Sequence, residues 1–308
     1  MMSRIYVTVG LPGSGKSTWA ENMKEVLDFT LHSSDNIRSE FGDINDQSNN
    51  ELVFNILYKR IKEDLKNGHN VVFDATNLSR KRRIHFIQHE LRDIPCKKIC
   101  VLFATPYEIC LKNNANRERK VPEDVIKRMV KNFEVPAYCE SWDDIQIVWW
   151  NYKKEFNIYS DLLKWKKLSH NNLNHSLSVG DHMINAAYHH YCNYPENYKL
   201  HMALLMHDCG KPFTKSYIDR NGNESEEAHY YQHENVSSYM SLFYLKDIHP
   251  KEWTDDDILE VSLLINLHMR TLNAWSQSDS SKEKDRKLFG DEIIEALEVI
   301  NECDLAAH

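Results

Sequence analysis

Residues 10–17 read Gly-Leu-Pro-Gly-Ser-Gly-Lys-Ser and match the pattern G-x-x-x-x-G-K-[ST] at every fixed position. Glycines in such a loop let backbone N–H groups converge on phosphate oxygens, and the helix that follows adds a positive dipole end. The lysine reaches the β- and γ-phosphates, and the hydroxyl after it holds Mg²⁺. The sequence therefore predicts binding of ATP, or another NTP or dNTP donor, with Mg²⁺. The predicted nucleotide-binding residues here are Gly13, Ser14, Gly15, Lys16, Ser17 and Thr18, with Ser17 as the Mg²⁺ ligand.

A second group of reactive residues centres on His207 and Asp208, within the apolar segment 204–212. Gly210 and Pro212 follow closely and predict that the helix ends there, which would turn both side chains into one pocket. Imidazole nitrogen and carboxylate oxygen suit a borderline divalent metal. Further candidate ligands are His182, His233, His268 and Asp304; in the series that includes His207 and Asp208, the intervals are 25, 25, 35 and 36 residues. This spacing puts each on a different helix, as a site inside a helical bundle requires, although surface histidines remain the alternative from spacing alone.

The elements that must position the phosphate loop follow an α/β pattern. Short apolar runs predict strands at residues 5–9, 29–32, 71–73, 99–103 and 145–150. Helical spacing appears after the glycine loop and over residues 51–67. Alternation of strands and helices predicts a parallel sheet flanked by helices. Ligands of such a sheet lie at the carboxyl ends of its strands, which places the loop, Asp35 and Asp74 along one edge.

The composition changes after the polar segment 151–155, and no alternating strand pattern returns. Apolar runs at 184–188, 202–206 and 258–265 predict buried helices. We therefore predict two domains, an α/β domain over residues 1–152 and an all-α bundle over residues 153–308.

The bulk composition limits the classes of protein. A chain of 308 residues with 42% hydrophobic and 27% charged residues is typical of a soluble globular protein. Apolar runs are too short for a membrane span and the beginning of the sequence lacks a signal-peptide pattern. Seven cysteines without a C-x-x-C pair argue against a disulfide framework and favour a cytoplasmic, reducing location. Residues 1–150 carry 22 Lys and Arg against 21 Asp and Glu, and the remainder carries 16 against 25. Any basic nucleic-acid track should thus lie in the first half.

Two features of the first half have more than one interpretation. Asp35 can serve as a general base that accepts a proton from an attacking hydroxyl, or as the N-cap of a helix. The basic run at residues 80–83 fits either a nucleic-acid track or a solvated helix face.

Four motifs in the first half together resemble the phage-type polynucleotide 5′-kinases. They are the glycine loop, Ser-Asp-Asn-Ile-Arg at 34–38, Asp-Ala-Thr-Asn at 74–77 and Arg-Glu-Arg-Lys-Val-Pro at 117–122. The resemblance implies Asp35 as general base for a 5′-hydroxyl and Arg38 as a contact to the acceptor phosphate. It also implies Asp74 and Asn77 as supports near the donor phosphates and Arg117 as a lid arginine. Where this family tends to place another lid arginine the chain has asparagines at 113 and 114, and Arg119 is the candidate replacement.

The second half resembles the HD phosphohydrolase superfamily in the order, spacing and flanking sequence of its candidate ligands. This likeness implies His182, His207, Asp208 and Asp304 as ligands of one metal, and His233 and His268 as ligands of a second metal or of the phosphate. It implies one or two divalent transition metals (Mn, Zn, Co, Ni or Fe), Lys211 facing the scissile phosphate, and attack by a metal-activated water. His175 and His229 share helix faces with the ligands and are interpreted as structural. The related end-healing enzymes carry an arginine where this chain has His308.

Together the two resemblances predict a bifunctional end-healing enzyme. It would phosphorylate 5′-hydroxyl ends and remove 2′,3′-cyclic, 2′- or 3′-phosphate ends of a nucleic acid, with RNA favoured over DNA. A separate ligase would then seal the ends, and no membrane is involved. Two alternatives remain: a metabolite or nucleoside kinase fused to a nucleotide phosphohydrolase, and a kinase with a nucleotide-sensing, non-catalytic HD domain.

Overall fold

The computed structural model describes residues 2–41, 50–151, 155–172, 176–248 and 253–307. The chain divides into two compact units, one comprising Met1–Met129 and Pro136–Asn151 and the other Val130–Val135 and Tyr152–His308. The sequence pattern predicts a single break near residue 152, whereas the segment Val130–Val135 belongs with the second unit. The predictions made for His175 and His308 lie outside the described residues.

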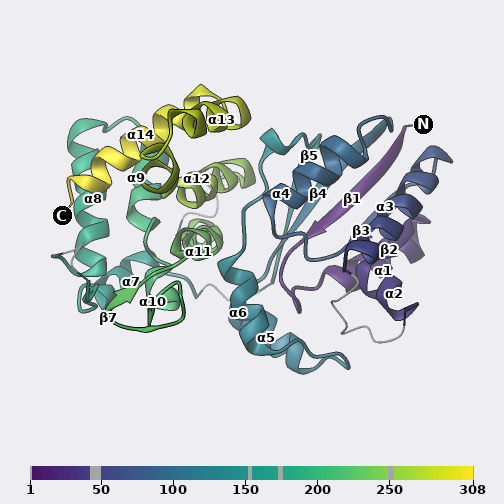
Figure 1. Ribbon diagram of the computed structural model, residues 1–308, viewed down its shortest axis with the longest axis horizontal. Coiled ribbons are helices and arrows are strands. Elements are labelled where there is room, and N and C mark those ends of the chain that lie inside the picture. The colour runs from purple at the N-terminus through teal and green to yellow at the C-terminus, as the bar shows by residue number, and fades with distance from the viewer. Residues whose placement is uncertain (1, 42–49, 152–154, 173–175, 249–252, 308) are drawn as a thin grey trace. The chain divides into compact units, whose positions relative to one another are not determined.

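The first unit is built on a five-stranded parallel sheet with the order β2-β3-β1-β4-β5 (Figure 1). Its strands are β1 Ser3–Val9, β2 Thr30–Ser33, β3 Val71–Asp74, β4 Cys96–Ala104 and β5 Asp144–Trp149. The register pairs Val7 of β1 with Phe73 on one side and Cys100 on the other. The predicted parallel sheet is thus confirmed, and the P-loop follows its central strand.

Helices connect these strands, as the alternating pattern predicts. They are α1 Lys16–Leu27, α2 Ser34–Ser39, α3 Asn50–Lys66, α4 Arg80–Ile84 continued by the π-helix η1 His85–Glu90, α5 Tyr107–Ala115, α6 Glu123–Lys131 and the 3₁₀ turn η2 Tyr138–Glu140. Strand β3 is buried along its whole length and β4 along most of it. One apolar cluster joins Ala20, Phe29 and Val72, and a second is formed by alternate residues of β4. Burial of these side chains on both faces explains why the strands are nearly continuous apolar runs.

A buried ion pair lies beneath the loop that follows β3. The Arg83 guanidinium is 2% exposed and donates two hydrogen bonds of 2.7 Å to the Glu140 carboxylate. Another of its N–H groups donates to the carbonyls of Asn77 and Leu78 at 3.0 and 2.9 Å. Arg80 is buried as well, with its Nε 3.6 Å from Glu140. Half of the basic run at residues 80–83 is therefore structural, and neither sequence interpretation of the whole run holds.

Replacing Arg83 by Met should destabilise the first unit by about 3–5 kcal/mol, because Glu140 would stay buried without its main partner. The matched control is Arg82→Met, since Arg82 is exposed on the same short helix and should change stability by less than about 0.5 kcal/mol. Urea unfolding, monitored through amide hydrogen exchange in β3 and β4, would measure the change in stability of both variants. An equal loss in the two variants would contradict the role assigned to the ion pair.

The second unit is helical, as predicted, with a core formed by apolar faces of its longer helices. The helices are α7 Ile158–Trp165, α8 Val179–Asn193, α9 Tyr198–Met206, α10 Lys211–Thr214, α11 His233–Ile248, α12 Asp255–Leu267, the π-helix η3 Thr271–Trp275, α13 Asp279–Phe289 and α14 Asp291–Leu305. Side-chain caps begin several of them. Ser178 accepts from Asp181 N before α8, and Thr254 forms a capping box with Asp257 before α12.

The prediction of an all-α second domain is wrong at one place. Strands β6 Ser216–Ile218 and β7 Glu224–His229 form a two-stranded antiparallel hairpin. Its turn is held by the Asp219 carboxylate, which accepts from the N–H groups of Asn221 and Asn223, and Gly222 has φ 86°. The Asn221-Gly222 pair at this turn is a recognised hairpin signal, so the hairpin is predictable from the sequence.

The segment Val130–Val135 packs within the second unit through one aromatic anchor. Phe133 is fully buried and its ring meets Tyr239 of α11 edge-on, with 5.1 Å between centroids. Asn235 donates to the Lys131 carbonyl at 2.7 Å. These contacts explain why Val130–Val135 belongs to the second unit, although the segment lies within the range predicted for the α/β domain.

Among the described residues, no helix is both long enough and apolar enough to cross a bilayer.

Candidate functional site

The P-loop after β1 adopts backbone angles that favour glycine. Gly13 and Gly15 have φ 80° and 95°. A Cβ on Gly13 would lie 2.3 Å from the carbonyl oxygen of Cys110, so the loop can pack on α5 only with glycine there. Asn113 of α5 donates to the Gly13 carbonyl at 2.9 Å. One of the asparagines found where the related kinases carry an arginine therefore supports the loop.

Lys16 begins α1 and lies over the loop. Its Nζ donates to the Leu11 carbonyl at 2.6 Å and to Ser14 Oγ at 3.2 Å. Burial lowers the pKa of Lys16, the Asp74 carboxylate raises it in part, and the charge of Arg117 lowers it further. The predicted Mg²⁺ ligand Ser17 and its neighbour Thr18 are exposed in the first turn of the same helix.

The loop after β3 is tied to the central strand by polar contacts. Thr8 Oγ1 donates to the Asp74 carboxylate at 3.1 Å, and Asn77 Nδ2 donates to the Thr8 carbonyl at 2.9 Å. Asn77 has φ 44°, a left-handed conformation that asparagine tolerates better than most residues. The hydrogen bond from Gly10 N to the Thr76 carbonyl joins this loop directly to the P-loop. Asp74 and Asn77 thus stand beside the phosphate-binding loop.

Asp35 lies in the first turn of α2, and Ser33 is the N-cap of that helix. The N-cap interpretation of Asp35 is therefore wrong. One carboxylate oxygen of Asp35 accepts from Arg38 at 2.9 Å, and the other lies 2.5 Å from the guanidinium of Arg119. Arg119, the candidate replacement for a lid arginine, is thus paired with Asp35, the predicted general base. A carboxylate can accept about four hydrogen bonds, so an acceptor hydroxyl can still reach it.

In the second unit, the predicted ligands come together at the ends and inner faces of five helices. His182 Nε2 lies 2.8 Å from Asp304 Oδ1 and 3.3 Å from His207 Nε2. Asp208 Oδ1 lies 3.1 Å from His233 Nε2, and Asp208 Oδ2 lies 3.4 Å from His207 Nε2. His268 completes the cluster, with its Nε2 3.3 Å from that of His233.

The donor set forms two overlapping groups that could each hold an ion. They are His182, His207 and Asp208, and Asp208, His233 and His268, with Asp208 shared. Asp304 stands beside the first group. All six side chains are buried, so water has little access to their polar atoms.

The outer nitrogens of the histidines fix the state of the inner ones. Nδ1 of His207, His233 and His268 lies 2.7–2.8 Å from the carbonyls of Leu204, Tyr230 and Ile265, respectively, and Nδ1 of His182 lies 3.4 Å from that of Ala307. A carbonyl only accepts, so each Nδ1 carries a proton and Nε2 of the neutral ring presents a lone pair to the cluster. Two such lone pairs 3.3 Å apart repel each other unless a cation lies between them. Metal-ligating histidines commonly make this outer hydrogen bond, so the residues fit a divalent transition metal.

The charges of the cluster also favour a bound cation. Burial alone would raise the pKa of Asp208, but Lys211 and His207 outweigh it and hold that pKa well below its usual range. Burial lowers the pKa of His207, yet the Asp208 and Asp304 carboxylates raise it to about 9. Burial and the neighbouring His233 lower the pKa of His268 to about 3. The cluster therefore attracts positive charge to its centre, as a proton or as a divalent cation.

Lys211 lies beside this cluster, together with His170, which is not among the predicted site residues. Lys211 Nζ is 2.6 Å from Asp208 Oδ2 and 3.1 Å from Nε2 of His170. His170 is fully buried, and burial together with the Lys211 charge lowers its pKa to about 4. No local motif surrounds His170, so only its count among the 12 histidines after residue 151 could have drawn attention to it.

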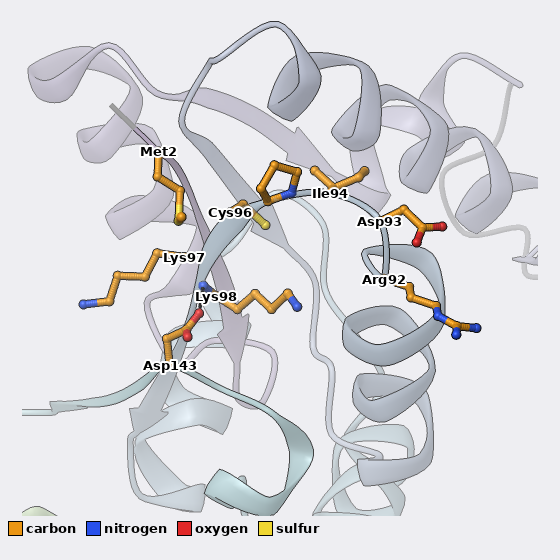
Figure 2. A pocket seen from close by; sticks show the side chains of 9 residues that line it. Met2, Arg92, Asp93, Ile94, Cys96, Lys97, Lys98 and Asp143 are labelled. Atoms are coloured by element: carbon orange, nitrogen blue, oxygen red, sulfur yellow. Dashed lines mark hydrogen bonds between the residues drawn. The ribbon is translucent and has the colours of Figure 1, made fainter.

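Two surface cavities lie outside these clusters. One of about 820 Å³ is lined by Arg92, Lys97 and Lys98 at the amino ends of β1 and β4, the sheet edge opposite the P-loop (Figure 2). Its cations are largely solvated and it contains no predicted site residue. The other, of about 150 Å³, is lined by residues next in sequence to two of the histidines, including Glu234 and Met269.

Known proteins resemble parts of this chain. The family model described as AAA domain matches residues 5–136. L-seryl-tRNA(Sec) kinase of Methanococcus maripaludis is 27% identical over 144 residues, covering 45% of this chain and 56% of the relative. Protein kti12 of Schizosaccharomyces pombe is 24% identical over 153 residues, covering 45% and 54%, respectively. The chain thus spans about half the length of the curated relatives it matches. A solved Pnkp1/Rnl/Hen1 RNA repair complex is similar with 24% identity and a TM-score of 0.39, covering 42% of this chain and 44% of the other.

By its parallel sheet, its P-loop geometry and its likeness to the L-seryl-tRNA(Sec) kinase, the first unit is similar to kinase-type P-loop domains, for which ATP and Mg²⁺ are the implied cofactors.

Replacing Asp208 by Asn should remove most of the bound metal from the second unit, because both donor groups share this carboxylate. Metal content after loading with Mn²⁺ or Zn²⁺ and dialysis, measured by mass spectrometry, would show the loss. His229→Gln is the control, since the His229 ring stacks on Tyr231 with 5.2 Å between centroids and belongs to neither donor group. An Asp208→Asn protein that retains the full metal content would refute the assignment.

Proposed function

We propose that the chain heals nucleic-acid ends, with RNA as the favoured substrate. In this proposal the P-loop domain transfers a phosphoryl group from ATP to a 5′-hydroxyl, and the helical unit removes a 2′,3′-cyclic, 2′- or 3′-phosphate. A separate ligase would act afterwards. The observation that carries the proposal is the occurrence in one chain of an acceptor-side carboxylate beside a P-loop and a buried His/Asp cluster beside a lysine.

The kinase proposal is supported by the placement of Asp35. The Asp35 carboxylate follows the carboxyl end of β2, and the P-loop follows the same end of the parallel strand β1. Arg38 and Arg119 orient this carboxylate. A carboxylate there can accept the hydroxyl proton while Arg38 pairs with a phosphate of the acceptor. The charge of Arg117 acts to lower the pKa of Lys16, and Arg117 is the group proposed to offset charge on the donor phosphates.

An acceptor attached to RNA is favoured by one of the relatives. The M. maripaludis relative is named as a kinase of L-seryl-tRNA(Sec), so its named substrate is linked to an RNA. Transfer of this preference to the present chain is part of the proposal. A 5′-hydroxyl oligoribonucleotide and a mononucleoside offered with labelled ATP would distinguish it from the alternative of a metabolite kinase. Phosphorylation of the nucleoside alone would favour that alternative.

The hydrolase proposal is supported by the donor chemistry of the second unit. His182, His207, Asp208 and Asp304 would hold one divalent metal, and His233 and His268 would hold a second metal or the phosphate. A metal bound there would polarise a phosphoryl oxygen and make a water molecule more acidic. Lys211 would bind the anionic oxygens of the same phosphoryl group. If no metal is bound and no phosphate ester is hydrolysed, the result supports the alternative, in which the second unit is a nucleotide sensor.

Single substitutions should separate the two activities. Asp35→Asn should lower 5′-phosphorylation by roughly 10²–10⁴-fold through loss of the base, and leave the removal of 3′-phosphates unchanged. Asp208→Asn should abolish the phosphatase and leave the kinase intact. Each variant serves as the folding control for the other, with end-labelled oligoribonucleotides as substrates. Full kinase activity in Asp35→Asn, or full phosphatase activity in Asp208→Asn, would overturn the corresponding assignment.

A further inference from the structure

His170 is held firmly in the polypeptide between α7 and α8. Its side chain is fully buried, and the isolated bridge between Ser169 and Ser178 brackets the segment that carries it. The Tyr230 hydroxyl donates to the His170 carbonyl. The N–H of Ala228 donates to the carbonyl of Asn171, the residue after His170, at 2.8 Å. These contacts fix the backbone on both sides of the imidazole.

The ring orientation of His170 is fixed as well. Nδ1 lies 2.8 Å from the Leu177 carbonyl, which only accepts, so Nδ1 carries the ring proton. Nε2 therefore presents a lone pair, and it lies 3.1 Å from Lys211 Nζ. An ammonium is a donor only, so the two groups form an N–H···N hydrogen bond. His170 faces Lys211 with its lone pair and belongs to neither group of candidate metal ligands.

We propose that His170 is a positioning residue that holds the Lys211 ammonium beside Asp208, ready to bind a phosphoryl oxygen. This inference rests on the proposed hydrolase function. A lysine side chain has a flexible four-carbon stem and loses rotamer entropy when it is fixed. Contacts to Asp208 Oδ2 at 2.6 Å and to His170 define two directions of the tetrahedral ammonium and so fix its orientation.

The chemistry of the partner explains why an imidazole suits this place. A second carboxylate beside Lys211 would cancel the positive charge that a phosphoryl group needs. A neutral imidazole accepts a hydrogen bond and leaves that charge in place. When Asp208 shares its negative charge with a divalent cation, the attraction between Asp208 and Lys211 weakens. The uncharged contact to His170 does not weaken in this way and continues to restrain the ammonium.

Two near-isosteric variants separate the two hydrogen bonds of His170. In His170→Gln the side-chain amide can place an acceptor near the position of Nε2 and so keep the contact to Lys211. In His170→Asn the amide reaches only the position of Nδ1, which keeps the donor to Leu177 and loses the acceptor. With the proposal, H170N should lower kcat for phosphate-ester hydrolysis by roughly 10–100-fold, as misplacement of a binding group does. H170Q should stay within a few-fold of the unaltered protein.

The dependence on Lys211 is tested by a double-mutant cycle. In a Lys211→Met background, H170N should cause no further loss, because His170 acts through the ammonium. Metal content should be equal in the single and double variants. If H170N still lowers kcat in the Lys211→Met background, or if H170N loses metal, the positioning role is wrong.

Binding of inorganic phosphate to the metal-loaded full chain, measured by calorimetry, gives a readout that needs no turnover. Weaker binding in H170N than in H170Q supports the inference even if no phosphate ester is hydrolysed, a result that would defeat the hydrolase proposal alone. Equal binding in the two variants, or no binding in the unaltered protein, overturns the inference. The thermal unfolding transition of the second unit reports its folding; if H170N fails this check, His170→Ser replaces it in the same comparisons.

Discussion

A buried carboxylate, Asp208, is the charge on which the arrangement of the second unit depends. Burying an ionised group costs several kcal/mol unless partners compensate. Here a lysine and three histidines lie within 3.5 Å of the two carboxylate oxygens. The elements that carry these partners converge at this point, and α9 ends at Met206 directly before His207 and Asp208.

The same requirement explains how closely the surrounding backbone packs. The turn after Asp208 approaches α11 so nearly that a Cβ on Gly210 would lie 2.5 Å from the His233 carbonyl. Gly210 N also donates to Ser237 Oγ at 2.9 Å. This close approach brings Asp208 within reach of His233 and links the two groups of donors. In the first unit, glycine does the equivalent work at Gly13, where the P-loop meets α5.

Much of this could be predicted from the sequence, since local spacing encodes elements and motifs. The five strands and the P-loop follow from short patterns. The six candidate ligands follow from the resemblance to the HD phosphohydrolases, and the structure brings these ligands together. His170 could not be predicted, because its role depends on a contact 41 residues away along the chain with no motif around it. The Arg83–Glu140 pair spans 57 residues and reads locally as an exposed basic run. Tertiary contacts of this kind reverse the meaning of a local pattern.

The most direct test of the account is a single RNA that carries a 5′-hydroxyl and a 2′,3′-cyclic phosphate, incubated with the protein, ATP, Mg²⁺ and a transition metal such as Mn²⁺ or Ni²⁺. Both ends are followed in one reaction by chromatography and mass spectrometry. The account predicts an RNA with a 5′-phosphate and free 2′- and 3′-hydroxyls. Conversion of neither end under any metal, while a free nucleoside or nucleotide is processed, would contradict it.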